Sequence, residues 1–226
     1  MKIIESKTRT EYLRIQIAAS RKKFKYCKVS VACISRFKEI INRGNNNVNI
    51  KGPILCLGTR NGREIDLFRI IFFGNRLRNL IIKLLEVHKY GFSSLFRIVE
   101  TFGKSDVNRI DKKSVVGVEL NPDGERKDVL IGSFDELPRD WACKFKIIYA
   151  NTIDHAQDPY RTAQEWNRVL EPGGYFILGN GGIGEPSQIG CVGNLTLEDL
   201  RQLFPGELIY FNRFGNRYSD IIIQKK

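Results

Sequence analysis

Hydrophobic positions along the chain follow two kinds of pattern. From Thr8 to Arg43 there is no glycine or proline, and apolar residues recur at steps of three and four, which predicts two helices. After the polar linker 45–47, short continuous apolar runs alternate with stretches of helical periodicity. The runs that we interpret as strands are residues 54–57, 115–120, 129–131, 145–150 and 175–178.

The remaining elements complete a fold. A helix is predicted over 159–170, opened by Pro159 near its first turn. Thr196 and Asp199 have the spacing of a capping box, which begins a short helix. The stretches "GELIYF" and "RYSDIIIQ" then form a last pair of strands. Strands that alternate with helices predict an α/β protein with a Rossmann-like doubly wound sheet, and the closing hairpin adds an antiparallel strand.

Composition narrows the class of protein. Of the 226 residues 42% are hydrophobic and 27% are charged, which is typical of a globular chain. No apolar run reaches the ~18 residues of a membrane span, and the opening "MKIIESKTRTEYL" is too charged for a secretory signal. We therefore expect a cytoplasmic protein. The two histidines exclude a His-rich metal site, and we predict no metal.

The five cysteines are predicted to be buried, reduced thiols. They are odd in number, form no C-x-x-C pair and stand mostly inside apolar runs: Cys27, Cys33, Cys56, Cys143 and Cys191.

The charge is strongly positive. The formal net charge is +12, and the excess is concentrated in the first fifty residues. Such a region is either a solvated helical face or a surface for an anionic partner, nucleic acid included.

A glycine turn is the first candidate for chemistry. "PILCLGTRNGRE", residues 53–64, reads as a strand, a turn with Gly58 and Gly62, and a helix. The glycines let the backbone approach a ligand, and the helix offers free N–H groups to an anion. The second strand ends in Glu119, a carboxylate suited to two ribose hydroxyls. This combination predicts a site for a ribose-containing cofactor.

A second glycine motif favours a different cofactor and is rejected. "GNGGIG", residues 179–184, matches the dinucleotide fingerprint. However, "EPS" follows it directly, and no strand with a terminal acid comes about twenty residues later. We interpret the stretch as a loop after a strand.

Five motifs in order resemble those of one large family. They are "ILCLGTRNG" (54–62), "VVGVELNP" (115–122), "IGSFDELP" (131–138), "FKIIYANTIDHAQDP" (145–159) and "RVLEPGG" (168–174). From about residue 53 to the C-terminus the chain resembles the class I S-adenosylmethionine-dependent methyltransferases, in particular their small-molecule branch. The resemblance implies an enzyme that uses S-adenosylmethionine.

The resemblance also implies positions for the cofactor. It places the methionine part beside Gly58, Arg60 and Gly62, the ribose on Glu119, the adenine against Ser133 and Phe134, and the methyl group near Asn151.

Three residues depart from the family pattern. Cys56 replaces the usual acid of the first motif, Ser133 replaces the common adenine-binding aspartate, and Arg60 stands where a glycine is normal. The Arg60 guanidinium either pairs with the carboxylate of the cofactor or points outward from a degenerate turn.

The pair Asp154 and His155 follows the fourth strand, where the resemblance places the mouth of the site. We consider His155, with Asp154 beside it, the candidate general base for a hydroxyl acceptor; the alternative is a positioning role.

Three parts of the chain are expected. Residues 1–50 form a basic helical extension, and residues 51–226 form the methyltransferase domain. The domain carries an insertion at about 67–113, because the family has about twenty residues between the first turn and the second strand's acid. The amphipathic stretch 76–88 inside it packs on the core as a lid, forms a dimer contact or lies on a membrane.

The leading functional hypothesis is methyl transfer from S-adenosylmethionine to a small or mid-sized acceptor, such as an oxygen of a saccharide or another metabolite. One alternative is a nucleic-acid (RNA) methyltransferase, because of the basic extension. The other is a non-catalytic scaffold, because of the three departures.

Overall fold

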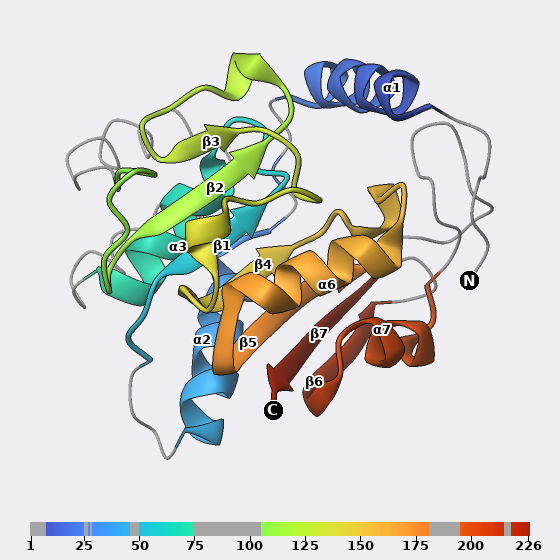
Figure 1. Cartoon of the computed structure of the whole chain (residues 1–226). Helices are drawn as coiled ribbons and strands as arrows, with labels where there is room; N and C mark the ends of the chain where they lie inside the picture. The colour runs from blue at the N-terminus through green and yellow to red at the C-terminus, as the bar shows by residue number, and fades with distance from the viewer. Residues whose placement is uncertain are drawn as a thin grey trace.

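The computed structural model describes residues 8–24, 27, 29–45, 50–74, 105–180, 195–214 and 218–226. Within them a seven-stranded sheet forms the centre of the molecule (Figure 1). The strands are β1 (Ile54–Leu57), β2 (Val115–Glu119), β3 (Val129–Ile131), β4 (Phe145–Ala150), β5 (Leu170–Asn180), β6 (Gly206–Phe214) and β7 (Tyr218–Lys225). The helices are α1 (Arg9–Lys22), α2 (Val31–Gly44), α3 (Arg63–Phe73), α6 (Pro159–Val169) and α7 (Leu197–Leu203). Short 3-10 turns are η1 (Pro122–Gly124), η2 (Arg139–Trp141) and η3 (Ile153–His155).

The sheet has the order β3-β2-β1-β4-β5-β7-β6. The first five strands are parallel, and β7 runs antiparallel between β5 and β6. This confirms the predicted doubly wound sheet with its closing hairpin. The order reverses at β1, so the carboxyl ends of β1 and β4 meet where such sheets bind ligands.

One strand is longer than predicted. β5 begins at Leu170, which pairs with Phe145, and the register shifts before the next pair. Gly173 has a φ of 69° inside this strand, a left-handed conformation that lets the chain bend and then resume pairing.

The sheet separates two hydrophobic cores. In β1, Leu55 and Leu57 face the core under α6 and α7, while Ile54 and Cys56 face the core under α2 and α3. All four side chains are buried because parallel strands are covered on both faces, which explains the continuous apolar run.

The helix starts agree with the sequence patterns. The Asp158 carboxylate accepts from the N–H groups of Tyr160 and Arg161, ahead of α6 with Pro159 in its first turn. Thr196 and Asp199 form the predicted capping box of α7. α2 contributes Ile34, Phe37 and Ile41 to the core over β1, whereas α1 lies apart from both cores, beyond the carboxyl ends of β2 and β4 (Figure 1).

Several predictions concern residues outside the described ranges. The amphipathic stretch 76–88, most of the loop "GNGGIG" and Cys191 are among them. The division at residue 50 and the insertion at 67–113 stay predictions, although α3 continues to Phe73. Among the described helices, none has the length and hydrophobicity needed to cross a bilayer.

Candidate functional site

The turn after β1 is held in an unusual backbone conformation. Gly58, Arg60 and Gly62 have φ values of 72°, 49° and 73°. A side chain in this left-handed region costs roughly 1–2 kcal/mol, so Arg60 occupies a position that favours glycine. The turn is tied to β2, because the N–H of Gly58 donates to the carbonyl of Val118 at 2.9 Å.

A buried ion network fixes the other side of the turn. Arg126 donates to the carbonyl of Asn61 at 3.2 Å and to the Asp66 carboxylate at 2.7 and 3.0 Å. Asp128 accepts from both Arg126 and Arg69. Burial alone lowers the pKa of Arg126, but the two carboxylates outweigh it and raise that pKa. The guanidinium therefore stays charged and joins the start of α3 to the start of β3.

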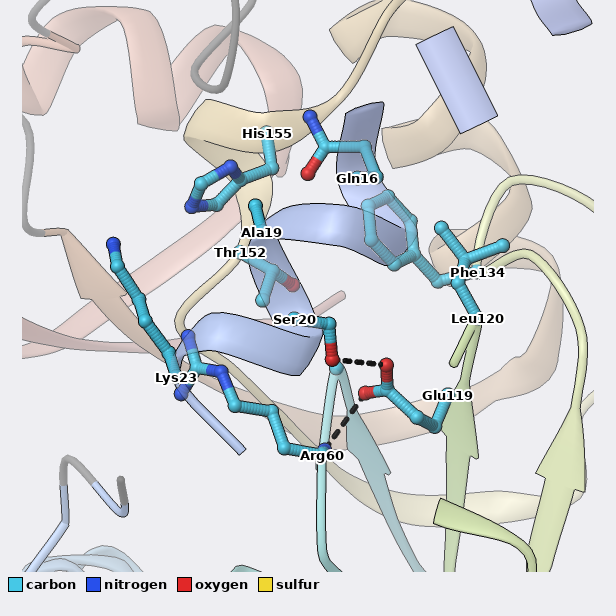
Figure 2. Close-up of a pocket in the computed structure, with 11 residues that line it drawn as sticks. Gln16, Ala19, Ser20, Lys23, Arg60, Glu119, Leu120, Phe134, Thr152 and His155 are labelled. Atoms are coloured by element: carbon cyan, nitrogen blue, oxygen red, sulfur yellow. Dashed lines mark hydrogen bonds between the residues drawn. The ribbon is translucent and has the colours of Figure 1, made fainter. Parts of the chain in front are cut away.

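Glu119 ends β2 with its side chain buried beside this turn. Only 4% of its surface is exposed. Its Oε2 accepts from the backbone N–H of Arg60 at 2.7 Å, and its Oε1 accepts from the N–H of Asn121 at 3.0 Å. A third donor comes from far away in the chain: the hydroxyl of Ser20 lies 2.8 Å from Oε1 (Figure 2).

The two residues predicted to contact adenine are placed differently. Phe134 lines a pocket next to Glu119 and packs edge-on against Trp166, with ring centroids 5.8 Å apart. The hydroxyl of Ser133 accepts from the guanidinium of Arg9 at 2.9 Å and from the N–H of Asp135 at 3.2 Å. Ser133 is therefore occupied by protein groups and does not line the pocket.

Of the residues after β4, some line the pocket and others do not. His155 and Thr152 line the pocket. Asn151 is 8% exposed and donates to the Tyr149 hydroxyl at 3.3 Å, behind the pocket wall. Between Asp154 Oδ2 and His155 Nε2 the distance is 3.9 Å, so the carboxylate acts on the imidazole through charge rather than through a hydrogen bond.

The pocket combines five segments of the chain. Its lining comprises Gln16, Ala19, Ser20, Lys23, Gly58, Arg60, Glu119, Leu120, Phe134, Thr152 and His155 (Figure 2). It thus gathers Gly58, Arg60, Glu119, Phe134 and His155 from the predicted site. The other predicted site residues, Gly62, Ser133, Asn151 and Asp154, are not among the lining residues.

Sequence reasoning missed one entire wall of the pocket. Helix α1 contributes Gln16, Ala19, Ser20 and Lys23, although its charge suggested only a solvated face or a surface for an anionic partner. A signal was present, because Tyr12, Gln16 and Ala19 recur at steps of four and three and define one face of a helix.

Two basic side chains give the pocket a positive side. Lys23 and Arg60 lie near each other, and the carboxylate of Glu119 lies opposite (Figure 2). Such a pocket suits a ligand with an anionic group at one end and hydroxyl donors at the other. The residues present therefore fit a nucleoside that carries a carboxylate.

A buried acid lies beneath the turn, two residues after Gly62. Glu64 is 1% exposed, and neither carboxyl oxygen has a well-formed hydrogen bond to the described residues. Burial raises its pKa to about 7. The nearby Cys27 thiol has its pKa raised to about 12, first by burial and then by Glu64. Burial thus favours the neutral form of both groups.

The prediction of buried cysteines was correct for Cys56 and wrong for Cys143. Cys143 is exposed, with a φ of 51°, because it lies in the turn between η2 and β4 rather than within the strand. Cys27 and Cys33 are half-buried, and these four thiols are free.

The chain matches known proteins at the level of the domain and the fold. Residues 104–178 match the family model described as a methyltransferase domain. The search of curated proteins found no match to this sequence.

Solved structures of similar fold cover almost the entire chain. One is a 1,6-didemethyltoxoflavin-N1-methyltransferase from Burkholderia thailandensis with bound 1,6-didemethyltoxoflavin and S-adenosylhomocysteine, at 14% identity and a TM-score of 0.61, covering 99% of this chain and 94% of that one. Another is an S-adenosylmethionine-dependent methyltransferase from Thermotoga maritima, described as a possible histamine N-methyltransferase, at 15% identity and a TM-score of 0.51, covering 97% and 100%. The [4+2]-cyclase SpnF also has this fold, at 12% identity and a TM-score of 0.53, covering 99% and 98%.

At these identities the structural likeness establishes only the fold. The family model adds a sequence match to a methyltransferase domain over residues 104–178. Strand order β3-β2-β1-β4-β5-β7-β6 with an antiparallel β7 is the arrangement of this fold. The chain therefore has the class I methyltransferase fold, and its residues 104–178 match a methyltransferase domain.

Proposed function

We propose that the protein transfers a methyl group from S-adenosylmethionine to a small or mid-sized acceptor. One observation carries the proposal: the buried carboxylate of Glu119 faces the pocket beside a left-handed turn at the end of β1. A buried carboxylate at the end of the second strand suits ribose hydroxyls, and the adjoining turn suits the close approach of a ligand.

The pocket residues suit the parts of this cofactor. Glu119 binds the ribose, and Phe134 offers an apolar face to the adenine. Gly58 and Gly62 shape the turn beside the methionine part, whose carboxylate pairs with Arg60. Asn151 and Ser133 complete the set as supporting residues, because their side chains bind Tyr149, Arg9 and Asp135 instead.

Methyl transfer requires little covalent chemistry from the protein's own residues. When bound, S-adenosylmethionine supplies an activated methyl group and its own leaving group. The chain aligns the acceptor and excludes water, and α1 closes one side of the pocket for this purpose. The His155 imidazole accepts the proton that a hydroxyl acceptor loses, with the charge of Asp154 nearby.

For the acceptor we propose a hydroxyl of a saccharide or another metabolite. Support comes from His155 in the pocket wall, since a base is most useful for a hydroxyl. The two compared methyltransferases are both described with nitrogen methylation. Acceptor screens therefore include amines and heteroaromatic nitrogens beside the hydroxylated metabolites.

Calorimetric titration with S-adenosylhomocysteine tests the proposal. We expect one-to-one micromolar binding to the full chain and a loss of at least 100-fold in Glu119→Ala, because two ribose hydrogen bonds to a charged group disappear. Glu125→Ala is the matched control, since Glu125 is an exposed glutamate directly after η1. Thermal unfolding of each variant verifies that the fold is intact.

Two results would contradict the proposal. Undiminished affinity in folded Glu119→Ala would remove Glu119 from the site. Absence of binding to the wild type at millimolar ligand would favour a non-catalytic scaffold with the same fold.

A further inference from the structure

Helix α1 is attached to the ends of three strands. At its first turn Arg9 forms a 2.7 Å ion pair with Asp135, which follows β3. Tyr12 is fully buried, and its hydroxyl donates to the carbonyl of His155 at 2.7 Å, after β4. These contacts fix the N-terminal half of α1 against the segments that follow β3 and β4.

The C-terminal half is held at the end of β2. Ser20 donates to Glu119, as described above, and Arg21 forms a 3.3 Å pair with Asp123. More than half of each side chain in the second pair is exposed, at 56% and 52%. Exposed pairs of this kind contribute little, so Ser20 is the main attachment of this half.

The hydrogen bonds of Glu119 can be counted. An ionised carboxylate offers about four acceptor positions, two on each oxygen. The backbone N–H groups of Arg60 and Asn121 fill one on each oxygen, and both donors are fixed by the fold. Ser20 fills the second position on Oε1, so the donors among the described residues leave one position on Oε2. A ribose that binds through two hydroxyls needs two.

We propose that α1 is a self-blocking cap, in which the Ser20 hydroxyl occupies the place of one ribose hydroxyl on Glu119. The proposal rests on the proposed function, because it takes Glu119 as the ribose ligand. Nucleoside binding then requires Ser20 to release Glu119, while the attachments of Arg9 and Tyr12 keep the other half of α1 in position. Cofactor affinity then depends on whether α1, a helix outside both hydrophobic cores, keeps its hydrogen bond from Ser20 to Glu119.

The position of Ser20 in the pocket supports this role. Figure 2 shows its hydroxyl pointing at one oxygen of the Glu119 carboxylate, while the Arg60 backbone N–H points at the other. Gln16 and Ala19, one turn earlier and adjacent, line the same pocket. A ligand on Glu119 therefore meets α1 directly, and no longer-range coupling is needed.

Calorimetry on three variants of the full chain tests the cap, with S-adenosylhomocysteine as the ligand. Ser20→Ala removes the competing donor, and we expect about tenfold tighter binding, the lower end of what a hydrogen bond to a charged group is worth. Ser20→Thr keeps a hydroxyl and is expected to bind like the wild type. Thr10→Ala removes an exposed hydroxyl from the same helix and is expected to change nothing.

Hydrogen exchange without ligand provides a second readout. In Ser20→Ala we expect amides of residues 17–22 to exchange faster than in the wild type, with residues 9–14 unchanged, because only the C-terminal attachment is lost. Unchanged exchange at 17–22 would mean that the contact does not hold the helix, and it would overturn the cap.

The possible failures are distinct. Equal or weaker binding by Ser20→Ala, with a binding wild type, overturns the cap and leaves the proposed function standing. Absence of binding by wild type, Ser20→Ala and Ser20→Thr at millimolar ligand overturns the proposed function and the cap with it. Binding by Ser20→Ala alone supports both, with the wild type strongly blocked.

Discussion

The buried hydroxyl of Tyr12 donates a 2.7 Å hydrogen bond to the backbone carbonyl of His155, 143 residues later in the chain. Tyr12 belongs to α1, and His155 ends η3 after β4. The bond therefore joins the N-terminal helix to the segment that carries the candidate base, and it fixes both at the pocket.

Removing this hydroxyl weakens the attachment of α1. In Tyr12→Phe the His155 carbonyl loses its donor in a buried place, so we expect the free energy of unfolding to fall by about 1–2 kcal/mol. Chemical denaturation measures the change. Tyr160→Phe removes a hydroxyl from a side chain that is 53% exposed and is expected to stay within about 0.5 kcal/mol of wild type. Equal effects in the two variants would contradict the anchoring role.

Arg60→Gly separates the two interpretations of Arg60. Glycine adopts the φ of 49° without strain, which offsets the greater flexibility that it gives the unfolded chain. We therefore expect an unfolding free energy within about 1 kcal/mol of wild type. If the guanidinium pairs with the carboxylate of the cofactor, the affinity for S-adenosylhomocysteine falls by about tenfold.

Adenosine is the control ligand for this variant, because it lacks the amino-acid part. Its affinity is expected to be the same for wild type and Arg60→Gly. An unchanged affinity for S-adenosylhomocysteine would instead mean that the side chain points away from the ligand.

Glu64 makes stability depend on pH. Its folded pKa of about 7 lies above the ordinary value of 4.5, because the carboxyl group is buried. Between these pH values the folded protein keeps a proton that the unfolded chain has released, so the free energy of unfolding falls as pH rises from about 4.5 to 7. Above pH 7 the free energy of unfolding has lost the full contribution of this proton, about 3 kcal/mol.

Glu64→Gln removes this titration. The unfolding free energy of the variant relative to wild type is expected to rise by about 3 kcal/mol between pH 4.5 and 7.5. Denaturant unfolding at several pH values measures it, with Glu125→Gln as the exposed control. A constant difference across the window would show that Glu64 does not titrate there.

Sequence patterns predicted the sheet well because buried parallel strands leave a local signature. The apolar runs of β1, β2 and β4 predicted these strands, and the acid at the end of β2 indicated one side of the site. Pro159, Thr196 and Asp199 indicated helix starts for the same reason, since caps satisfy backbone groups within a few residues.

The parts that were missed depend on contacts between distant segments. The basic side chain of Arg9 suggests a solvated face, yet it binds Asp135 and Ser133. The face of α1 with Gln16 and Ser20 is too polar to resemble a core helix, and only the fold reveals what it covers. The ion network of Arg126 with Asp66 and Asp128 likewise has no local signature.

Substitution of His155 distinguishes a catalytic base from a positioning residue. The side chain lines the pocket, whereas its backbone carbonyl holds Tyr12, so His155→Ala removes the imidazole and keeps the anchor of α1. With a hydroxyl acceptor we expect kcat to fall by about 10²–10⁴-fold and the affinity for S-adenosylhomocysteine to stay unchanged.

Asp154→Asn is the companion variant. At 3.9 Å the carboxylate makes no hydrogen bond to the imidazole, so its removal is expected to lower kcat by less than about tenfold. Steady-state rates of both variants with a saturating acceptor measure the two effects on kcat. A normal kcat in His155→Ala would rule out the base. It would also favour a nitrogen acceptor whose lone pair is already available, because such an acceptor attacks the methyl group before it loses a proton.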